Sequence, residues 1–121
     1  SGCTVLHAGT ASAAVPLMRV RDVIVLREAV EDLEAGRNFY DRQETGVGRY
    51  FLDCLLSDLE SLRLYAGIHP VHFGLHRLLS RRFPFAIYYD VSDGLARVTA
   101  VIDMRRDPAW TRRELGERTK S

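Results

Sequence analysis

The chain has 121 residues, of which 46% are hydrophobic and 27% are charged, and its formal net charge is +1. This length and composition predict one folded domain with its own core, and they exclude a multidomain enzyme, a fibrous protein and a disordered chain. Two cysteines, Cys3 and Cys54, are too few for a disulfide framework or a four-thiolate zinc site. Because no apolar run approaches the length of a membrane helix, we expect a cytoplasmic protein with no membrane partner.

Charge is distributed unevenly along the chain. Residues 27–60 contain nine acidic and four basic side chains, whereas residues 61–121 contain eleven basic and six acidic ones. The two segments therefore carry net charges of −5 and +5. Sixteen of the seventeen basic residues are arginine, with Lys120 as the exception. Because arginine keeps its proton in proteins, the basic segment is suited to binding anions rather than to transferring protons.

The N-terminal third begins without a pattern. Residues 1–17 contain no charged side chain and no helical or strand periodicity, so we interpret them as an added leader, an over-extended reading frame or a native arm. The folded domain is expected over residues 18–121. Polar and apolar residues alternate from residue 19 and then run apolar to 26, which predicts a strand. The apolar spacing over residues 27–45 predicts an amphipathic helix.

A second helix is expected directly after the first. Gly46-Val47-Gly48 interrupts the pattern, and apolar residues at helical spacing then predict about five turns that end at Tyr65. The short break predicts an antiparallel helical hairpin. Cys54 lies on the apolar stripe of the second helix, where we expect a small core side chain rather than a reactive thiol.

The C-terminal half is dominated by strand patterns. Residues 71–82 have the length of a strand, and residues 85–91 and 95–102 flank Asp93-Gly94, which predicts a hairpin. Pro108 predicts the start of a short terminal helix. The element order predicts an α+β fold, with an N-terminal strand, an antiparallel helical hairpin packed on a mainly antiparallel β-sheet of about four strands, and a short C-terminal helix. The hairpin is expected to leave one sheet face available to a partner.

Two groups of side chains resemble chemical sites only superficially. His69, His72 and His76 form H-x2-H-x3-H, but on one strand His72 and His76 would share a face about 13 Å apart, too far to bind one ion. Six carboxylates fit the solvated face of the first helix, namely Glu28, Glu31, Asp32, Glu34, Asp41 and Glu44. No phosphate-binding or nucleophile-elbow motif occurs. We therefore expect neither a metal nor a cofactor.

Arginines gather on both sides of the predicted hairpin. If the two groups converge in space, they would bind phosphates or an acidic protein surface, and otherwise they are scattered solvated charges. The candidate binding residues are these arginines and a neighbouring tryptophan: Arg77, Arg81, Arg82, Arg105, Arg106, Trp110, Arg112 and Arg113.

The chain resembles the RelE/ParE superfamily of toxins from bacterial type II toxin-antitoxin systems. Four segments carry the resemblance: the strand and helix start at 18–29; Asp32-Leu33 with residues 39–40 and 46–51; Arg82-Phe83-Pro84-Phe85 and its continuation to 89; and residues 101–108, Val-Ile-Asp-Met-Arg-Arg-Asp-Pro. The last two are the more specific. Together the segments span about 90 residues, outside residues 1–17.

The resemblance leaves two activities open, because RelE-like members cleave mRNA on the ribosome and ParE-like members act against DNA gyrase. Cleavage needs groups that accept and donate protons as well as cations. Here no His follows His76, no Tyr follows Tyr89, and Asp103 stands where many relatives have His. This favours the ParE-like branch. For the ribonuclease alternative, the candidate catalytic residues are His72, His76, Arg81, Arg82, Tyr88, Tyr89 and Arg105.

The resemblance therefore implies a growth-inhibiting toxin that binds a cellular target, DNA gyrase in the ParE-like branch, and that takes part in plasmid stabilisation. It also implies neutralisation by a cognate antitoxin, commonly an acidic and partly disordered segment, in a toxin-antitoxin hetero-oligomer. A general nucleic-acid-binding domain is disfavoured by the small net charge and by the lack of base-stacking motifs. Direct nucleic-acid binding is expected only in the ribonuclease alternative.

Overall fold

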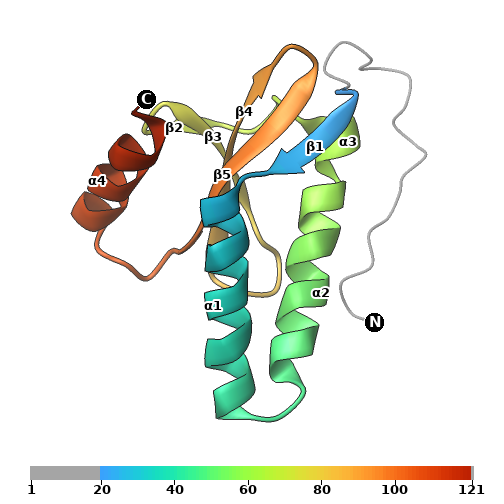
Figure 1. Cartoon of the computed structure of the whole chain (residues 1–121), viewed down its shortest axis with the longest axis vertical. Helices are drawn as coiled ribbons and strands as arrows, with labels where there is room; N and C mark the ends of the chain where they lie inside the picture. The colour runs from blue at the N-terminus through green and yellow to red at the C-terminus, as the bar shows by residue number, and fades with distance from the viewer. Residues whose placement is uncertain (1–19, 121) are drawn as a thin grey trace.

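The computed structural model describes residues 20–120, so the expected appendage at 1–17 lies outside the described residues. Figure 1 shows a helical hairpin, a twisted sheet and a C-terminal helix set apart from the hairpin. The predicted α+β architecture is confirmed. The elements in chain order are β1 (Asp22–Val25), α1 (Arg27–Gln43), α2 (Val47–Glu60), α3 (Leu62–Tyr65), β2 (Val71–His72), β3 (Leu75–Leu79), β4 (Phe85–Ser92), β5 (Leu95–Asp103) and α4 (Pro108–Thr119).

The sheet has five strands in the order β1-β5-β4-β3-β2, rather than about four. Strand β1 runs parallel to β5, and the other neighbours are antiparallel. The extra strand arises because residues 71–82, expected as one strand, fold back at Phe73 and Gly74, whose φ angles are 58° and 84°. His72 therefore pairs with Leu75 and His76 with Val71, which places the two histidines on opposite sheet faces. The expectation of a shared face was wrong.

The predicted second helix is divided near its end. Helix α2 stops at Glu60 and α3 begins at Leu62, although Ser61 itself has helical dihedral angles. The Ser61 hydroxyl donates to the carbonyl of Asp58 at 2.6 Å, and the Ser61 amide is shared between the carbonyls of Ser57 and Asp58. The Ser61 hydroxyl and amide compete for the same carbonyl, which interrupts the regular α-helical hydrogen bonding. The chain keeps its direction from α2 into α3. Cys54 is buried in the core, as expected for its place on the apolar stripe.

Two glycines bring the helices of the hairpin close together. A Cβ atom on Gly48 would lie 2.4 Å from the carbonyl oxygen of Arg37, and one on Gly36 would lie 2.5 Å from the ring of Phe51. The connection is fixed by Asp41, whose carboxylate accepts the amides of Gly46 and Gly48 at 2.9 and 3.3 Å. Close backbone contact is therefore required at Gly48, where a rigid carbonyl rather than a flexible side chain is the neighbour.

The sheet is covered on both faces. On one face, residues of the hairpin such as Leu33 and Phe51 pack against Ile87 and Val101. On the other face, Leu115 and other residues of α4 pack over Tyr88, Ala100 and Ile102. The expectation that the second face would be left available was therefore wrong for its centre, because the terminal helix folds back over it. Within residues 20–120 no helix has the length and apolar character needed to cross a membrane.

Replacing Gly48 by Ala should lower the free energy of unfolding by about 1–3 kcal/mol, because the added methyl group forces α1 and α2 apart. The matched control is Gly116→Ala in α4, where the added carbon meets no atom within 4 Å. That variant should be unchanged or more stable by up to about 1 kcal/mol, since alanine favours the helix. Urea denaturation of the two variants measures both effects, and equal stabilities would contradict the close-contact account.

Candidate binding cleft

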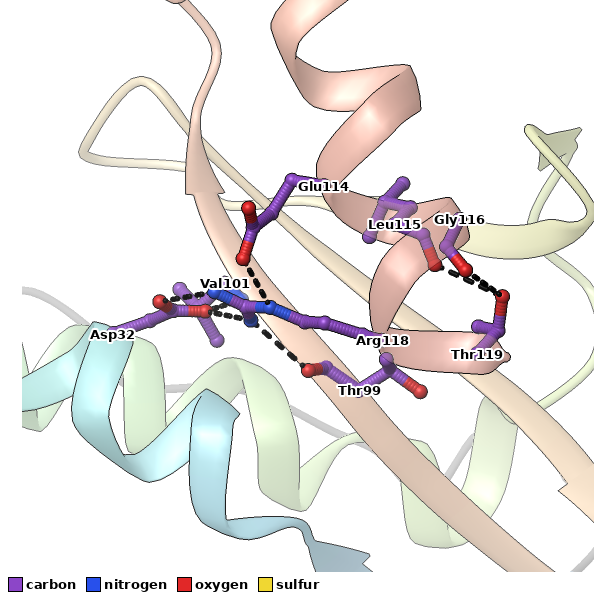
Figure 2. Close-up of polar contacts among 8 residues, drawn as sticks. All are labelled: Asp32, Thr99, Val101, Glu114, Leu115, Gly116, Arg118 and Thr119. Atoms are coloured by element: carbon purple, nitrogen blue, oxygen red, sulfur yellow. Dashed lines mark hydrogen bonds and ion pairs between the residues drawn. The ribbon is translucent and has the colours of Figure 1, made fainter. Parts of the chain in front are cut away.

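An ion pair between Asp32 of α1 and Arg118 of α4 connects the two layers at one edge of the sheet (Figure 2). The Arg118 nitrogens Nη1 and Nη2 donate to the two carboxylate oxygens of Asp32 at 2.6 and 3.0 Å. Arg118 Nε also donates to Glu114 at 2.9 Å. The side chains of Arg118 and Asp32 are 9% and 19% exposed, so the pair is largely withdrawn from solvent. Its hydrogen bonds to Asp32 raise the pKa of Arg118 above the ordinary arginine value.

The same two side chains also bind the backbone of β5. Asp32 accepts the amide of Val101 at 2.9 Å, and Arg118 donates to the carbonyl of Thr99 at 3.2 Å. The register between β4 and β5 shifts at this point, because Tyr88 pairs with Ala100 whereas Tyr89 pairs with Val98. Thr99 is thus the extra residue of a β-bulge. The ion pair satisfies backbone groups at an edge where β1 has already ended.

A cleft of about 740 Å³ lies between α1 and α4, beside this ion pair. One wall is the apolar side of α1, including Gly36 and Phe39, and the floor is the end of β5. The other wall is formed by the loop after β5 and by α4, which begins at Pro108 with Asp107 as its N-cap. The lining residues are Asp32, Ala35, Gly36, Phe39, Phe85, Val101, Ile102, Asp103, Arg105, Arg106, Asp107, Trp110 and Arg113.

Three arginines in the cleft have different surroundings. Arg105 is held by Asp103 through bonds of 2.9 and 2.7 Å, and this guanidinium lowers the pKa of the Asp103 carboxyl. The guanidinium of Arg106 lies 3.9 Å from the ring centre of Trp110. Within residues 20–120, neither Arg106 nor Arg113 has a carboxylate at ion-pair distance. The cleft therefore offers two arginines that form no ion pair within residues 20–120, beside an apolar wall and the carboxylates of Asp32, Asp103 and Asp107.

The structure separates the two groups of arginines that flank the β4–β5 hairpin. Arg105, Arg106, Trp110 and Arg113 line the cleft, whereas the remaining candidates lie elsewhere. Arg77 is on β3 opposite Tyr88, and its Nε is enclosed without a partner among the described residues. Arg81 and Arg82 are exposed between β3 and β4, and Arg112 is directed toward the ring of Phe73 at 5.9 Å. Asp32 was expected on the solvated face of the first helix, and its ion pair with Arg118 was not predicted.

The candidate nuclease residues are also dispersed. Tyr88 and Tyr89 are 2% and 0% exposed, and they belong to the cores on opposite faces of the sheet. His76 stacks on Tyr89 with ring centres 5.1 Å apart, on the hairpin side. His72 lies on the α4 side, and Arg105 is in the cleft with its guanidinium bound to Asp103. These residues do not meet around one position where a phosphodiester would bind.

Tyr89 and two histidines form a polar cluster that secures the loop between α3 and β2. The Tyr89 hydroxyl accepts the amide of Gly67 at 2.8 Å and lies 2.5 Å from Nδ1 of His69, while His76 Nδ1 donates to the His69 carbonyl at 2.7 Å. Burial raises the pKa of Tyr89, and burial together with His76 lowers the pKa of His69. Both shifts favour a neutral pair in which the tyrosine donates to the imidazole. In residues 20–120 no three His, Cys, Asp or Glu side chains are grouped to hold a metal ion.

Comparisons with known proteins give a fold but no family. No protein-family model matches the chain, and no curated protein matches it. Among solved structures, the chain is similar to one from "Chromosomal ParDE TA system from P. aeruginosa", with a TM-score of 0.65 and 17% sequence identity. The alignment covers 73% of this chain and 98% of that chain. The fold is therefore shared with a ParDE toxin-antitoxin system protein, in agreement with the RelE/ParE resemblance at the level of the fold.

Replacing Arg118 by Met should lower the free energy of unfolding by about 2–3 kcal/mol, since the largely buried Asp32 carboxylate would lose its bidentate partner; partial exposure keeps the loss below that of a fully buried pair. Lys120→Met is the matched control, because its ion pair with Glu117 is about 70% exposed on both sides. The control should change stability by less than about 0.5 kcal/mol. Chemical denaturation of both variants tests this, and equal losses would contradict a structural role for Arg118.

The neutral His69 should make stability depend on pH. Because the pKa of His69 is lower in the folded chain than in the unfolded chain, where it is about 6.5, its contribution is present above that value and is lost as the pH falls below it. The free energy of unfolding, measured by urea denaturation, should therefore fall between pH 7.5 and pH 5.5. This fall should be smaller for His69→Gln than for the unmodified chain. An unchanged difference would show that His69 is not the titrating group.

Proposed function

We propose that this protein is a ParE-like toxin of a type II toxin-antitoxin system, which acts in the cytoplasm by binding a cellular target rather than by catalysis. The main support is the fold that the chain shares with the ParDE system protein over 98% of that chain's length. DNA gyrase is the target that the ParE-like resemblance implies. A cognate antitoxin neutralises the toxin by covering its contact surface in a toxin-antitoxin complex.

The α1–α4 cleft is the proposed contact surface. Arg106 and Arg113, which form no ion pair within residues 20–120, line this cleft together with Phe39, which is 41% exposed. This combination fits a protein surface with acidic and apolar groups, because guanidinium groups bind carboxylates bidentately and an aromatic side chain gains from burial. The residues 18–121 then act as one toxin domain, whose central feature is this cleft.

The dispersion of proton-transfer groups supports binding over RNA cleavage. General acid–base catalysis requires the acid and the base within hydrogen-bond reach of the reacting atoms. Tyr89 and His76 instead secure a loop on the hairpin side, and the Tyr88 side chain is buried under α4. The RelE-like ribonuclease remains the alternative that the functional experiment distinguishes.

Expression of the full chain in a bacterial host without an antitoxin should arrest growth, with DNA synthesis falling before protein synthesis. Separate labelling of DNA and protein measures the order. The double variant Arg106→Glu/Arg113→Glu should abolish the arrest, because it reverses both free charges in the cleft. Its matched control is Arg81→Glu/Arg82→Glu, which makes the same change in net charge outside the cleft and should remain toxic.

Three results would contradict the proposal. Normal growth at full expression would exclude a toxin. Loss of protein synthesis first, with cut messages, would favour the ribonuclease alternative. Loss of toxicity in both double variants, with circular dichroism unchanged, would show that net basic charge rather than the cleft is responsible.

A further inference from the structure

The end of β5 has an open backbone edge inside the cleft. Strand β1 pairs with β5 only as far as Val25 and Val98, and the Leu26 amide makes the last contact by donating to the Val98 carbonyl. Beyond this point the edge of β5 faces α1 and α4 instead of another strand. The ion pair of Asp32 and Arg118 binds the amide of Val101 and the carbonyl of Thr99, which leaves the rest of the edge to be accounted for.

The register between β4 and β5 shows which other backbone groups of β5 point out of the sheet edge. Opposite residues of an antiparallel pair either exchange hydrogen bonds or direct their amides and carbonyls away from each other, in alternation. The Val101 amide is bound by Asp32, so the Val101–Ile87 pair does not exchange hydrogen bonds, and neither does Asp103–Phe85 two residues later. The Val101 carbonyl and the Asp103 amide therefore point away from β4. Within residues 20–120 neither group has another partner.

This acceptor and donor are spaced as an additional strand requires. In a parallel pair, one residue of the neighbouring strand donates to one carbonyl and accepts from the amide two residues further along the strand. Val101 and Asp103 both line the cleft. The cleft floor is therefore a short, unpaired sheet edge, and such edges are templates for another strand.

The two walls of the cleft differ in chemistry and lie on opposite sides of the sheet. Helix α1 packs on the face that carries Val101, and it contributes the apolar wall of Ala35, Gly36 and Phe39. Helix α4 packs on the face that carries Ile102, and it contributes Arg113 to the basic wall. Side chains of a strand placed on the edge would alternate between these walls, since successive residues point to opposite faces.

We propose that a partner segment with alternating apolar and acidic residues adds as a strand to the β5 edge in this cleft. Its backbone pairs with the Val101 carbonyl and the Asp103 amide, its apolar side chains contact α1, and its carboxylates bind Arg106 and Arg113. Main-chain pairing supplies affinity and the two walls supply specificity, as in other cases of strand addition. The identification of this segment as part of an antitoxin rests on the proposed function, whereas the binding chemistry does not.

The probe is the synthetic peptide acetyl-Val-Glu-Val-Glu-Val-Glu-amide, titrated into the ¹⁵N-labelled full chain. The amide signals of Asp103 and its neighbours should shift on binding. The decisive comparison uses two backbone-methylated peptides, one N-methylated at every Val and one at every Glu. An added strand pairs through alternate residues only, so one methylated peptide should lose binding and the other should keep it within about threefold.

Side-chain specificity is tested with the same titration. Arg113→Glu should weaken binding of the peptide at least tenfold, and replacement of each Glu of the peptide by Lys should abolish it. Arg112→Glu is the matched control, because Arg112 directly precedes Arg113 in α4 but lies outside the cleft. This variant should bind the peptide with an affinity within twofold of that of the unmodified chain. The spectrum of each variant without peptide reports whether the fold is retained.

Several results would overturn the inference. Loss of binding with both methylated peptides indicates a helical or other mode, and retention with both indicates loose electrostatic attachment. Absence of any shift near Asp103, or equal effects of the Arg112 and Arg113 variants, excludes the cleft. A toxic protein that fails to bind the peptide refutes only this inference, whereas a non-toxic protein that binds it in the alternating manner refutes only the proposed function.

Discussion

The Asp32–Arg118 ion pair is the interaction on which the arrangement of the layers depends. A single carboxylate receives the guanidinium of α4 and the Val101 amide of β5, so α1, α4 and the sheet are joined at one point. Both charges are largely withdrawn from water, and each would be costly without the other. Helix α4 otherwise contributes few buried residues, chiefly Thr111 and Leu115. Its position over the second sheet face therefore relies on this polar contact as well as on apolar packing.

The cleft is a direct consequence of this arrangement. Helices α1 and α4 pack on opposite faces of the sheet and are joined by the ion pair, and the cleft separates them around the free end of β5. Strand β1 is too short to cover that end, because the chain enters α1 directly after Leu26. The bulge at Thr99 turns further backbone groups toward Arg118. An open edge with an apolar wall and a basic wall is what remains.

The polar side chains of the molecule divide into structural and free groups. Asp41 fixes the helical connection, Tyr89 fixes the loop before β2, and Asp103 holds Arg105. Each of these three side chains has a hydrogen-bond partner within the fold. Arg106 and Arg113 are different, since neither forms an ion pair within residues 20–120. In the proposed function they recognise an anion attached to apolar groups, because an apolar wall lies in the same cleft.

Local patterns in the sequence were sufficient for most elements. Helical spacing predicted the hairpin, and Asp93-Gly94 predicted the turn between β4 and β5, because these signals depend on neighbouring residues only. The turn at Phe73 and Gly74 was missed, since a phenylalanine with positive φ has no local preference for that conformation. Nor could the sequence predict which arginines line the cleft and which lie elsewhere.

The amino-acid pattern alone indicates the fold class, the element order and the basic character of the C-terminal half. The three-dimensional arrangement was needed to show which arginines share a cleft, which are bound internally, and that α4 covers the second face. The physical reason is distance along the chain: Asp32 and Arg118 are 86 residues apart, and no periodicity or propensity encodes a contact between two isolated charges. Among the many possible charge pairs, this one forms because folding buries both side chains at the same place. The free edge of β5 results from the arrangement of α1 and α4 that this pair holds.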